Sequence, residues 1–524
     1  MRRRCLPPAL VFLAPAGMAA AVALWGWRTG RLLLYGDATA HLMIARRMLD
    51  SATPGLAQWG SVWLPFPHLL MAPWVQVDAL WRSGLAGSLV SIIAYSLATL
   101  WLYRLAARHL GEPAAVLAGL FFLLNPNLLY LASVPMTETV YLACFLGAVD
   151  QISRWTQTSR MGNYGAVWLA GAWALGGAMT RYDGWFMLPF FALVLAGAAM
   201  PDWRRAWGAF WRFCLLAGSG PLFWFAYNAY YYGDWLDFAR GPYSARQIYL
   251  RALRHGGQRY PGDHQWLNAL VYFLKAVELD CGLPLLLLGA IAWLLWIWQH
   301  RGDAARPLLT NCVPCLLWLP LPWYVWAMWT GNVPIFVPMY WPHGYYNLRY
   351  GVQLLPALAL FAGWQIWQLF RREGGGWRGG WVAGALCALL LLGYLRMFRG
   401  RGPMVYAEAA YNSTGRLAQE RQLAAALRRV RPDDKILMYI GTFPGALADD
   451  GIALKRVINE SNYQLWDNAL RRPQRYVEWI VLERHTWLAR GLNRRALGRY
   501  FTPAGQLHVP GQHTITLYRR IRPD

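Results

Sequence analysis

Long apolar blocks recur along residues 6–398 and constrain this chain more than any other feature. Eleven of them come near the length that a helix needs to cross a bilayer. They lie at about 6–27, 84–103, 113–131, 138–152, 164–180, 184–200, 207–227, 282–299, 307–328, 350–370 and 380–398. A soluble chain of 524 residues would instead divide into several globular domains. We therefore predict a mainly α-helical polytopic membrane protein with about eleven spans.

Arginines predict how the chain is oriented. Alternate connections are short and rich in arginine, which is typical of cytoplasmic loops. These residues are Arg2–Arg4, Arg104, Arg108, Arg154, Arg160, Arg204, Arg205, Arg301, Arg306, Arg371, Arg372 and Arg378. The long segments 28–83, 228–281, 329–349 and the part after 398 then face outward. We predict a bacterial inner (plasma) membrane protein with these segments in the periplasm or exterior.

The strong positive charge follows largely from that topology. A net charge of +24 on a soluble protein would indicate a nucleic-acid partner. Here much of the charge lies in short loops, so we expect membrane lipids and no nucleic acid as partners. The chain has no P-loop, GxGxxG or HExxH motif, and its cytoplasmic loops are short. These features argue against an ATP-driven step or a nucleotide-sugar donor.

The pattern changes after residue 398. Strand-like runs at 435–440, 456–460, 476–483 and 513–518 alternate with helical runs at 407–430, 463–471 and 486–497. Such alternation predicts a small α/β domain over 399–524, outside a transmembrane catalytic domain over 1–398. We interpret Asn412-Ser-Thr as the cap of the first helical run, rather than as a glycosylation acceptor. The short apolar patch 69–74 is too short to span and predicts an interfacial helix.

The first outer segment carries an acid where the chain leaves its first span. Asp37 precedes a helical pattern, and His41 lies one turn along the same face. Asp37 is explained either as the cap of this helix or as a catalytic acid. His68 follows an aromatic stretch in the same segment. All three are candidates for chemistry at the outer face.

Further polar side chains fall at the same predicted face. They are Glu138, Arg181, Tyr182, Asp183, His343, Tyr345 and Arg349. A carboxylate such as Glu138 in an apolar context is a functional candidate, or an acid that suits the helix dipole. Arg181 and Asp183 are explained as substrate ligands or as a structural ion pair. Arg349 suits a lipid phosphate, or it extends its side chain to the interface.

In layout and motifs the chain resembles the GT-C glycosyltransferases, which take sugar from polyprenyl-phosphate. It looks closest to the protein mannosyltransferases and the lipid A aminoarabinose transferases. The resemblance rests on Asp37 in the first outer loop, on Pro135-Met-Thr-Glu138, and on Asn347-Leu-Arg-Tyr-Gly-Val-Gln-Leu-Leu-Pro356 before an α/β tail. Ala38 follows Asp37 where those families often have Glu. The Trp-Trp-Asp-Tyr-Gly motif of the oligosaccharyltransferase branch is missing.

The resemblance implies a function and roles for these residues. It implies sugar transfer from a polyprenyl-phosphate donor to a lipid, glycan or protein acceptor at the periplasmic face, by an inverting displacement. Asp37 is then the catalytic base, Glu138 the second acid and Arg349 a ligand of the lipid phosphate, assisted by Arg181 or His343. Glu138 has two alternative roles. It orients the acceptor, which needs no cofactor, or it binds a divalent metal together with Asp37 and His41.

Two rival classes are weighed against this hypothesis. One is a transporter or flippase of lipid-linked saccharides, which often shows internal repeats and polar sites at mid-membrane. No repeat joins the two halves of this chain, and its polar candidates gather at one face. The other is a membrane scaffold without catalytic activity, which leaves Glu138 and the long outer segments unexplained.

Overall fold

The chain divides into two compact units, each described here by itself. The computed structural model describes residues 6–159, 163–301, 312–372, 376–441, 443–484 and 486–521. Arg2–Arg4, Arg160, Arg306 and residues 307–311 of a predicted span lie outside these ranges. Unit 1 comprises Met1–Trp25, Ser61–Phe66 and Leu89–Glu408, and unit 2 comprises Gly26–Gly60, Pro67–Ser88 and Ala409–Asp524.

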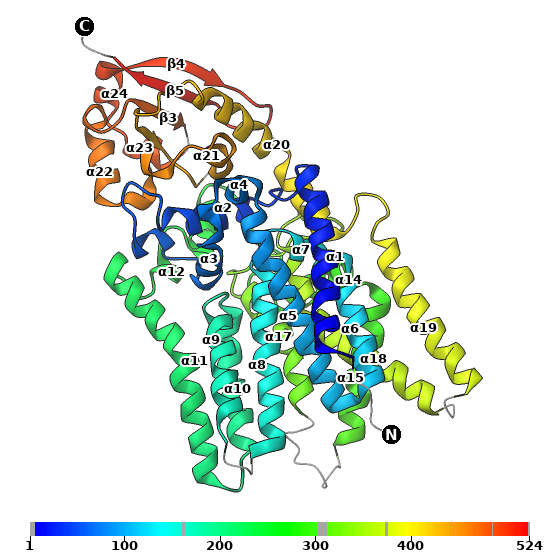
Figure 1. Ribbon diagram of the computed structural model, residues 1–524. Coiled ribbons are helices and arrows are strands. Elements are labelled where there is room, and N and C mark those ends of the chain that lie inside the picture. The colour runs from blue at the N-terminus through cyan, green and yellow to red at the C-terminus, as the bar shows by residue number, and fades with distance from the viewer. Residues whose placement is uncertain are drawn as a thin grey trace. The chain divides into compact units, whose positions relative to one another are not determined.

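Helices form at the predicted apolar blocks, and the chain is mainly helical as predicted. They are α1 (Pro8–Arg28), α5 (Leu85–Leu110), α6 (Glu112–Leu123), α7 (Pro126–Ser133), α8 (Glu138–Thr158), α9 (Gly165–Ala178), α10 (Asp183–Gly197), α11 (Trp203–Tyr232), α15 (Leu283–His300), η4 (Val313–Trp318), α17 (Pro320–Trp329), η5 (Leu348–Leu354), α18 (Leu355–Arg372) and α19 (Trp377–Arg396). Helices α8, α9, α10 and α11 lie side by side, and α18 packs against α6, α15 and α19 (Figure 1).

Fewer helices than eleven meet a strict requirement for spanning. In the described residues, five are long and apolar enough, or six if the bent pair α6–α7 counts as one span. Helices α9 and α10 are apolar but have only 14 and 15 residues. Others carry charge, such as the paired arginines near the start of α11. The blocks are therefore found as helices, and the count of eleven spans stays a prediction.

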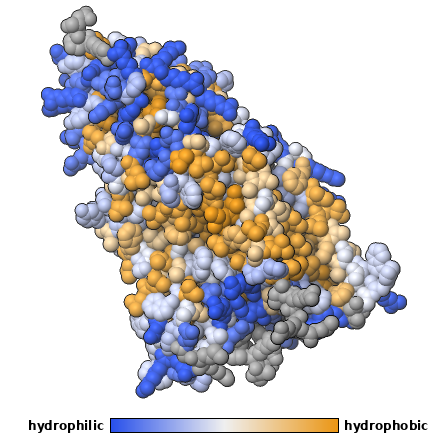
Figure 2. All heavy atoms as spheres, viewed as in Figure 1, coloured by the Kyte–Doolittle hydropathy of each residue, from blue (hydrophilic) through white to orange (hydrophobic). Residues whose placement is uncertain are grey.

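The surface of the helical unit supports a membrane location. Its exposed large apolar side chains include Leu215 and Leu222 on α11 and Leu287, Ile291 and Leu294 on α15. Figure 2 shows such residues gathered into a broad apolar surface over the helices. Exposed apolar area of this extent is uncommon on a soluble protein. The chain is an integral membrane protein.

Part of the predicted outer segment 228–281 also belongs to the helical unit. It contains α12 (Asp237–Arg240), α13 (Ala245–Arg254) and α14 (Trp266–Cys281). Helix α14 packs on η5, and a Cβ placed on Gly351 would lie 2.5 Å from the carbonyl carbon of Ala276. Glycine therefore allows η5 to approach α14 closely, which holds the segment that bears Arg349.

Short helices of the first outer segment belong to unit 2. They are α2 (Gly36–Arg47), η1 (Leu56–Trp59), α3 (Phe66–Met71), η2 (Trp74–Gln76) and α4 (Asp78–Ser83). The N-terminal cap residue of α2 is Tyr35, whose side chain makes no capping hydrogen bond. Asp37 is instead the second residue of the helix, so our interpretation of it as the cap was wrong.

A five-stranded mixed sheet forms the rest of unit 2 and confirms the predicted α/β character. Its strands are β1 (Ile436–Met438), β2 (Val457–Ile458), β3 (Trp479–Glu483), β4 (Phe501–Leu507) and β5 (Ile515–Arg520), in the order β2-β1-β3-β5-β4. Strands β1, β2 and β3 are parallel, and β5 is antiparallel to both β3 and β4. The sequence did not reveal β4, because Pro503 and Gly505 are unfavourable in strands.

Helices complete this unit. They are α20 (Met404–Leu427), whose residues up to Glu408 belong to unit 1, α21 (Pro444–Asp450), α22 (Gln464–Arg471), α23 (Trp487–Gly491) and α24 (Arg494–Tyr500), with short turns η6 (Leu454–Arg456), η7 (Glu460–Asn462) and η8 (Pro473–Arg475). Leu437 and Ile480 of the sheet are buried in one cluster with Trp466 of α22 and Leu488 of α23. Helix α20 begins before Asn412, which lies inside it, so the predicted cap at Asn412 was wrong.

Candidate functional site

Glu138 lies at the centre of a buried charged cluster in unit 1. It is the first residue of α8 and has no exposed surface. Its Oε1 accepts a hydrogen bond from Nε of Arg349 at 3.0 Å and another from Nη1 of Arg181 at 3.3 Å. The structure therefore brings together three of the predicted site residues, which are far apart in the sequence.

Arg181 and Asp183 lie at the turn between α9 and α10. Nε of Arg181 donates to the carboxylate of Asp183 at 3.2 Å. The hydroxyl of Tyr324 on α17 donates to Asp183 at 2.9 Å and accepts from Nη2 of Arg181 at 3.1 Å. The ion pair that we weighed as a structural explanation is present, and it is joined to Glu138 through Arg181.

Glu408 of α20 completes the cluster. Its carboxylate accepts from the backbone N–H groups of Asn347 and Arg349, at 2.8 and 3.2 Å, and from Nη1 of Arg349 at 3.3 Å. Asn347 adopts a left-handed conformation with φ of 56°, which asparagine tolerates better than most residues. Glu408 and Tyr324 were not among the predicted site residues. The only available signal for Glu408 was a single acid in an otherwise uncharged stretch.

The cluster holds three carboxylates and two guanidinium groups, so its formal charge is negative by one. The ring of Tyr350 lies 4.5 Å from the guanidinium carbon of Arg181 and 5.1 Å from that of Arg349. Charges this deeply buried persist only when they are paired. Oε2 of Glu138 is buried and has no hydrogen-bond partner in the described part of the chain. That oxygen is a candidate contact for a substrate or water.

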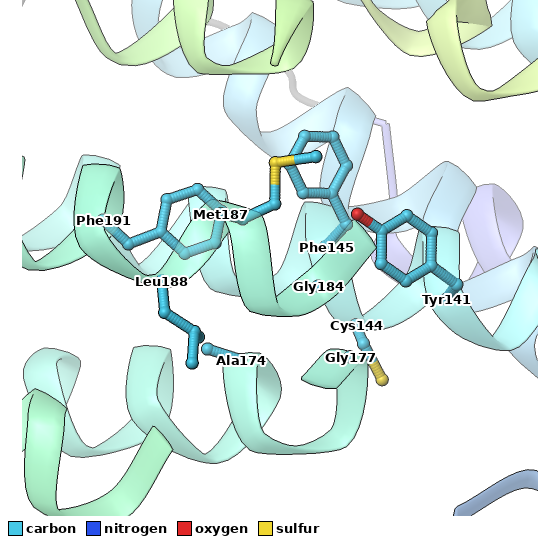
Figure 3. Close-up of a pocket in the computed structure, with 9 residues that line it drawn as sticks. All are labelled: Tyr141, Cys144, Phe145, Ala174, Gly177, Gly184, Met187, Leu188 and Phe191. Carbon is cyan, nitrogen blue, oxygen red and sulfur yellow. The ribbon is translucent and has the colours of Figure 1, made fainter. Parts of the chain in front are cut away.

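A small apolar cavity lies among α8, α9 and α10 (Figure 3). It measures about 10 Å³ and is lined by Tyr141, Cys144, Phe145, Ala174, Gly177, Gly184, Met187, Leu188 and Phe191. Tyr141 lies one helical turn after Glu138, and its hydroxyl has no hydrogen-bond partner among the described residues. Room for about one water excludes a sugar ring, so we place no substrate there.

Three other predicted residues of unit 1 make different contacts. The hydroxyl of Tyr182 donates to the carbonyl of Val62 at 2.7 Å. His343 is exposed, and its Nδ1 lies 3.2 Å from the carbonyl oxygen of Pro338. The hydroxyl of Tyr345 accepts from Arg401 at 3.2 Å. These contacts do not include the residues of the charged cluster.

His41 and His68 form a buried pair in unit 2. Nδ1 of His41 lies 2.9 Å from Nε2 of His68, a distance at which one ring donates to the other. Burial of His68, then the charges of His41 and Arg47, lowers its pKa well below the usual value. Nδ1 of His68 has no partner in the described ranges. His68 is therefore neutral at neutral pH.

Asp37 lies in the same unit as the histidine pair. It is half-buried in the first turn of α2, where a negative charge is favoured by the helix dipole. No group of three or more His, Cys, Asp or Glu side chains in the described residues is arranged to hold a metal ion.

Comparison with known proteins gives a match at the level of structure alone. No protein-family model and no curated protein sequence matches the chain. The crystal structure of ArnT from Cupriavidus metallidurans bound to undecaprenyl phosphate has a TM-score of 0.57 and 16% identity. The match covers 95% of this chain and 97% of that one.

A second match is the oligosaccharyltransferase AglB from Archaeoglobus fulgidus, in complex with an inhibitory peptide and a dolichol-phosphate. Its TM-score is 0.52 at 13% identity, over 96% of this chain and 74% of that one. Both proteins are GT-C glycosyltransferases, and ArnT is a lipid A aminoarabinose transferase. The likeness confirms the predicted GT-C fold. At these identities it establishes the fold alone.

Proposed function

We propose that this protein transfers a sugar from a polyprenyl-phosphate donor to an acceptor at the periplasmic face of the membrane. The observation that carries the proposal is the near end-to-end likeness to ArnT, a transferase solved with undecaprenyl phosphate. AglB, solved with dolichol-phosphate, adds a second lipid-phosphate protein of the same fold. The buried charged cluster around Glu138 supplies groups that suit such chemistry.

In this proposal Asp37 is the general base. The acceptor hydroxyl attacks the anomeric carbon while Asp37 takes its proton. The bond between that carbon and the lipid phosphate breaks, and its electron pair leaves with the phosphate oxygen. Attack opposite to the leaving group inverts the anomeric configuration. The acceptor is a lipid, a glycan or a protein.

Arg349 is proposed to stabilise the phosphate that leaves, with help from Arg181 or His343. Fixed cations aimed at developing negative charge are an effective means of catalysis in a water-poor site. Glu138 and Glu408 orient the guanidinium group of Arg349 through hydrogen bonds of 3.0 and 3.3 Å. Because the cluster is already negative by one, the phosphate has to share the guanidinium groups with these carboxylates.

Glu138 is proposed to orient the acceptor through its buried Oε2. The alternative role of Glu138 is to bind a divalent metal together with Asp37 and His41. His68, Tyr182, Asp183 and Tyr345 are assigned to substrate binding in this proposal. Asp183 acts by holding Arg181, to which it is hydrogen-bonded.

An apolar hollow supports the binding of an isoprenoid chain. It has a volume of about 360 Å³, lies between α10 and α11, and is lined by Leu188, Pro189, Ala192, Leu193, Phe210, Phe213, Cys214, Ala217 and Gly218. Its first lining residue follows Asp183 by one to two helical turns. A lipid tail in this hollow would have its phosphate near the end of α10 that bears the charged cluster.

The test is transfer by the purified protein in detergent, with a labelled polyprenyl-phosphate sugar and candidate acceptors. Asp37→Asn removes the base, and we expect turnover to fall by about 10²–10⁴-fold. Asp433→Asn is the control, because Asp433 is an exposed acid to which no role in the reaction or in holding α2 is assigned. Unimpaired turnover of a folded Asp37→Asn protein would overturn the assignment of the base. Movement of intact lipid-linked sugar between leaflets, without release of lipid phosphate, would indicate a flippase.

A further inference from the structure

Arg416 of α20 contacts the backbone that leads into α2. Its Nη2 donates to the carbonyl oxygens of Leu33 and Leu34, each at 2.9 Å. These carbonyls lie three and four residues before Asp37. A Cβ placed on Gly36 would lie 3.7 Å from Nε of Arg416, so the side chain lies close to the start of the helix.

The guanidinium group of Arg416 is itself held in place. Its Nη1 donates to Oε2 of Glu420 at 2.7 Å, one turn along α20. Glu420 is nearly fully buried, and its Oε1 accepts from the backbone N–H of Gly445 at 3.1 Å. A Cβ placed on Gly445 would clash with the carboxylate of Glu420, so glycine at this position allows the carboxylate to approach the backbone of α21 closely. Helices α20 and α21 therefore fix the direction in which Arg416 points.

The other end of α2 is held by different groups. Arg46 pairs with Asp50 at 3.1 Å and with Asp78 at 2.8 Å. Nε of Arg47 donates to the carbonyl of Gln58. The segment beyond α2 is bonded to the C-terminal part of the chain, as where Nδ2 of Asn462 donates to the hydroxyls of Ser51 and Thr53 at 3.1 and 2.8 Å.

The start of α2 depends on Arg416 for a further reason. Tyr35 at the cap position makes no side-chain capping hydrogen bond. A helix that begins without a side-chain cap has a less stable first turn, and this turn is the part most prone to open. Asp37 is in that first turn. The hydrogen bonds from Arg416 to the carbonyls of Leu33 and Leu34, called the Arg416 clamp below, limit how far this turn can shift.

We infer that Arg416 is a positioning residue for Asp37, through which the C-terminal part of the chain sets the geometry of the outer segment. The inference rests on the proposed function for its catalytic consequence. Its structural consequence, an ordered first turn of α2, is independent of that function. Arg416 touches backbone carbonyls and Glu420, and it is not assigned a contact with substrate.

The first experiment measures order directly. Hydrogen–deuterium exchange of the full-length protein in detergent is compared between wild type, Arg416→Gln and Arg428→Gln. Arg428 is the matched control, because it is an exposed arginine just after the end of α20. We expect exchange at residues 35–41 to rise at least several-fold in Arg416→Gln alone, with residues 66–71 unchanged. Unchanged exchange at 35–41 would overturn the inference, whatever the activity.

The second experiment separates positioning from a general loss of structure. We expect Arg416→Gln to lower kcat by about 10–100-fold, because a small misplacement of a catalytic group is costly, while KM for the donor stays within about twofold. Arg416→Lys should restore part of kcat, because an ammonium group still reaches one carbonyl but lacks the planar fork. A KM that rises with kcat unchanged would overturn the catalytic consequence. If exchange at residues 35–41 rises in Arg416→Gln but the wild-type protein transfers no sugar, the proposed function is rejected. The structural role of the Arg416 clamp is then still supported.

Discussion

The two units hold their candidate residues by different physical means. In unit 1, Glu138, Asp183 and Glu408 are buried and are paired with Arg181 and Arg349 through charged hydrogen bonds. In unit 2, His68 is neutral and lies within hydrogen-bond distance of His41, and Arg416 binds backbone carbonyls. The charged cluster costs desolvation and depends on every partner. In unit 2, the contact between the two histidines depends on which ring nitrogen carries the proton. The contacts of Arg416 depend on the backbone conformation at Leu33 and Leu34.

This difference predicts which substitutions lower the free energy of unfolding strongly and which leave it nearly unchanged. Removing one member of a buried ion cluster leaves an uncompensated charge. Removing an exposed arginine leaves a charge that water solvates.

Arg349→Gln should have the largest effect. It removes the guanidinium group that joins Glu138 to Glu408, and we expect a loss of about 3–5 kcal/mol in the free energy of unfolding. Denaturant titration in detergent measures the loss. The double variant with Glu138→Gln should regain part of the lost free energy. One of the two carboxylates that lose Arg349 as a partner, Glu138 and Glu408, is then uncharged. A single variant within about 1 kcal/mol of wild type would contradict the buried cluster.

Tyr324→Phe should have an intermediate effect. It deletes the hydroxyl that donates to Asp183 and accepts from Arg181. Hydrogen bonds to charged groups contribute about 1.5–3 kcal/mol, and we expect a loss in that range by the same titration. Tyr345→Phe is the control, because its hydroxyl contacts Arg401 in an exposed position. Equal losses for both variants would show that Tyr324 is no special contact.

His68 should make the stability of the protein depend on pH. Its pKa is lowered by burial, so the unfolded chain binds a proton below about pH 6.5 while the folded chain does not. Stability therefore falls as the pH falls, by up to about 1.4 kcal/mol for each pH unit below that value. Melting temperatures at pH 7.5 and 5.5 measure it. His68→Gln should flatten this dependence, whereas the exposed His343→Gln should not.

Arg428→Gln should have the smallest effect on stability. Arg428 pairs with Asp450 at 2.9 Å, but its side chain is 69% exposed. Exposed ion pairs contribute about 0–1 kcal/mol, so the melting temperature should hardly change. If Arg428→Gln destabilised the protein as much as Arg349→Gln, the proposed difference between buried and exposed charges would be wrong.

Much of the fold could be predicted because local patterns carry it. Apolar runs marked several helices to within a few residues, as for α1 and α15. Periodic apolar residues marked β1, β3 and β5 in the same way. Helix α14 was missed as an element because Lys275, Glu278 and Asp280 interrupt its apolar face. Strand β4 was missed because its exposed residues lack a repeating pattern.

The candidate site could be predicted only in part. Glu138, Arg181, Asp183 and Arg349 were singled out by their charge at the ends of apolar blocks. Their mutual hydrogen bonds were beyond the sequence, because they join residues up to 211 positions apart. Glu408 and Arg416 lie on α20, whose sequence reads as an ordinary polar helix. Nothing local distinguishes them from arginines and acids that face water.

The sequence by itself determined that this chain is a helical membrane protein with an α/β portion after its last apolar block. Hydrophobic periodicity and length act locally, so they can be read one segment at a time. Only the tertiary structure decided which charges are buried together and which side chain holds the start of α2. Electrostatic pairing and hydrogen bonding depend on positions in space, and these arise from packing of the whole chain.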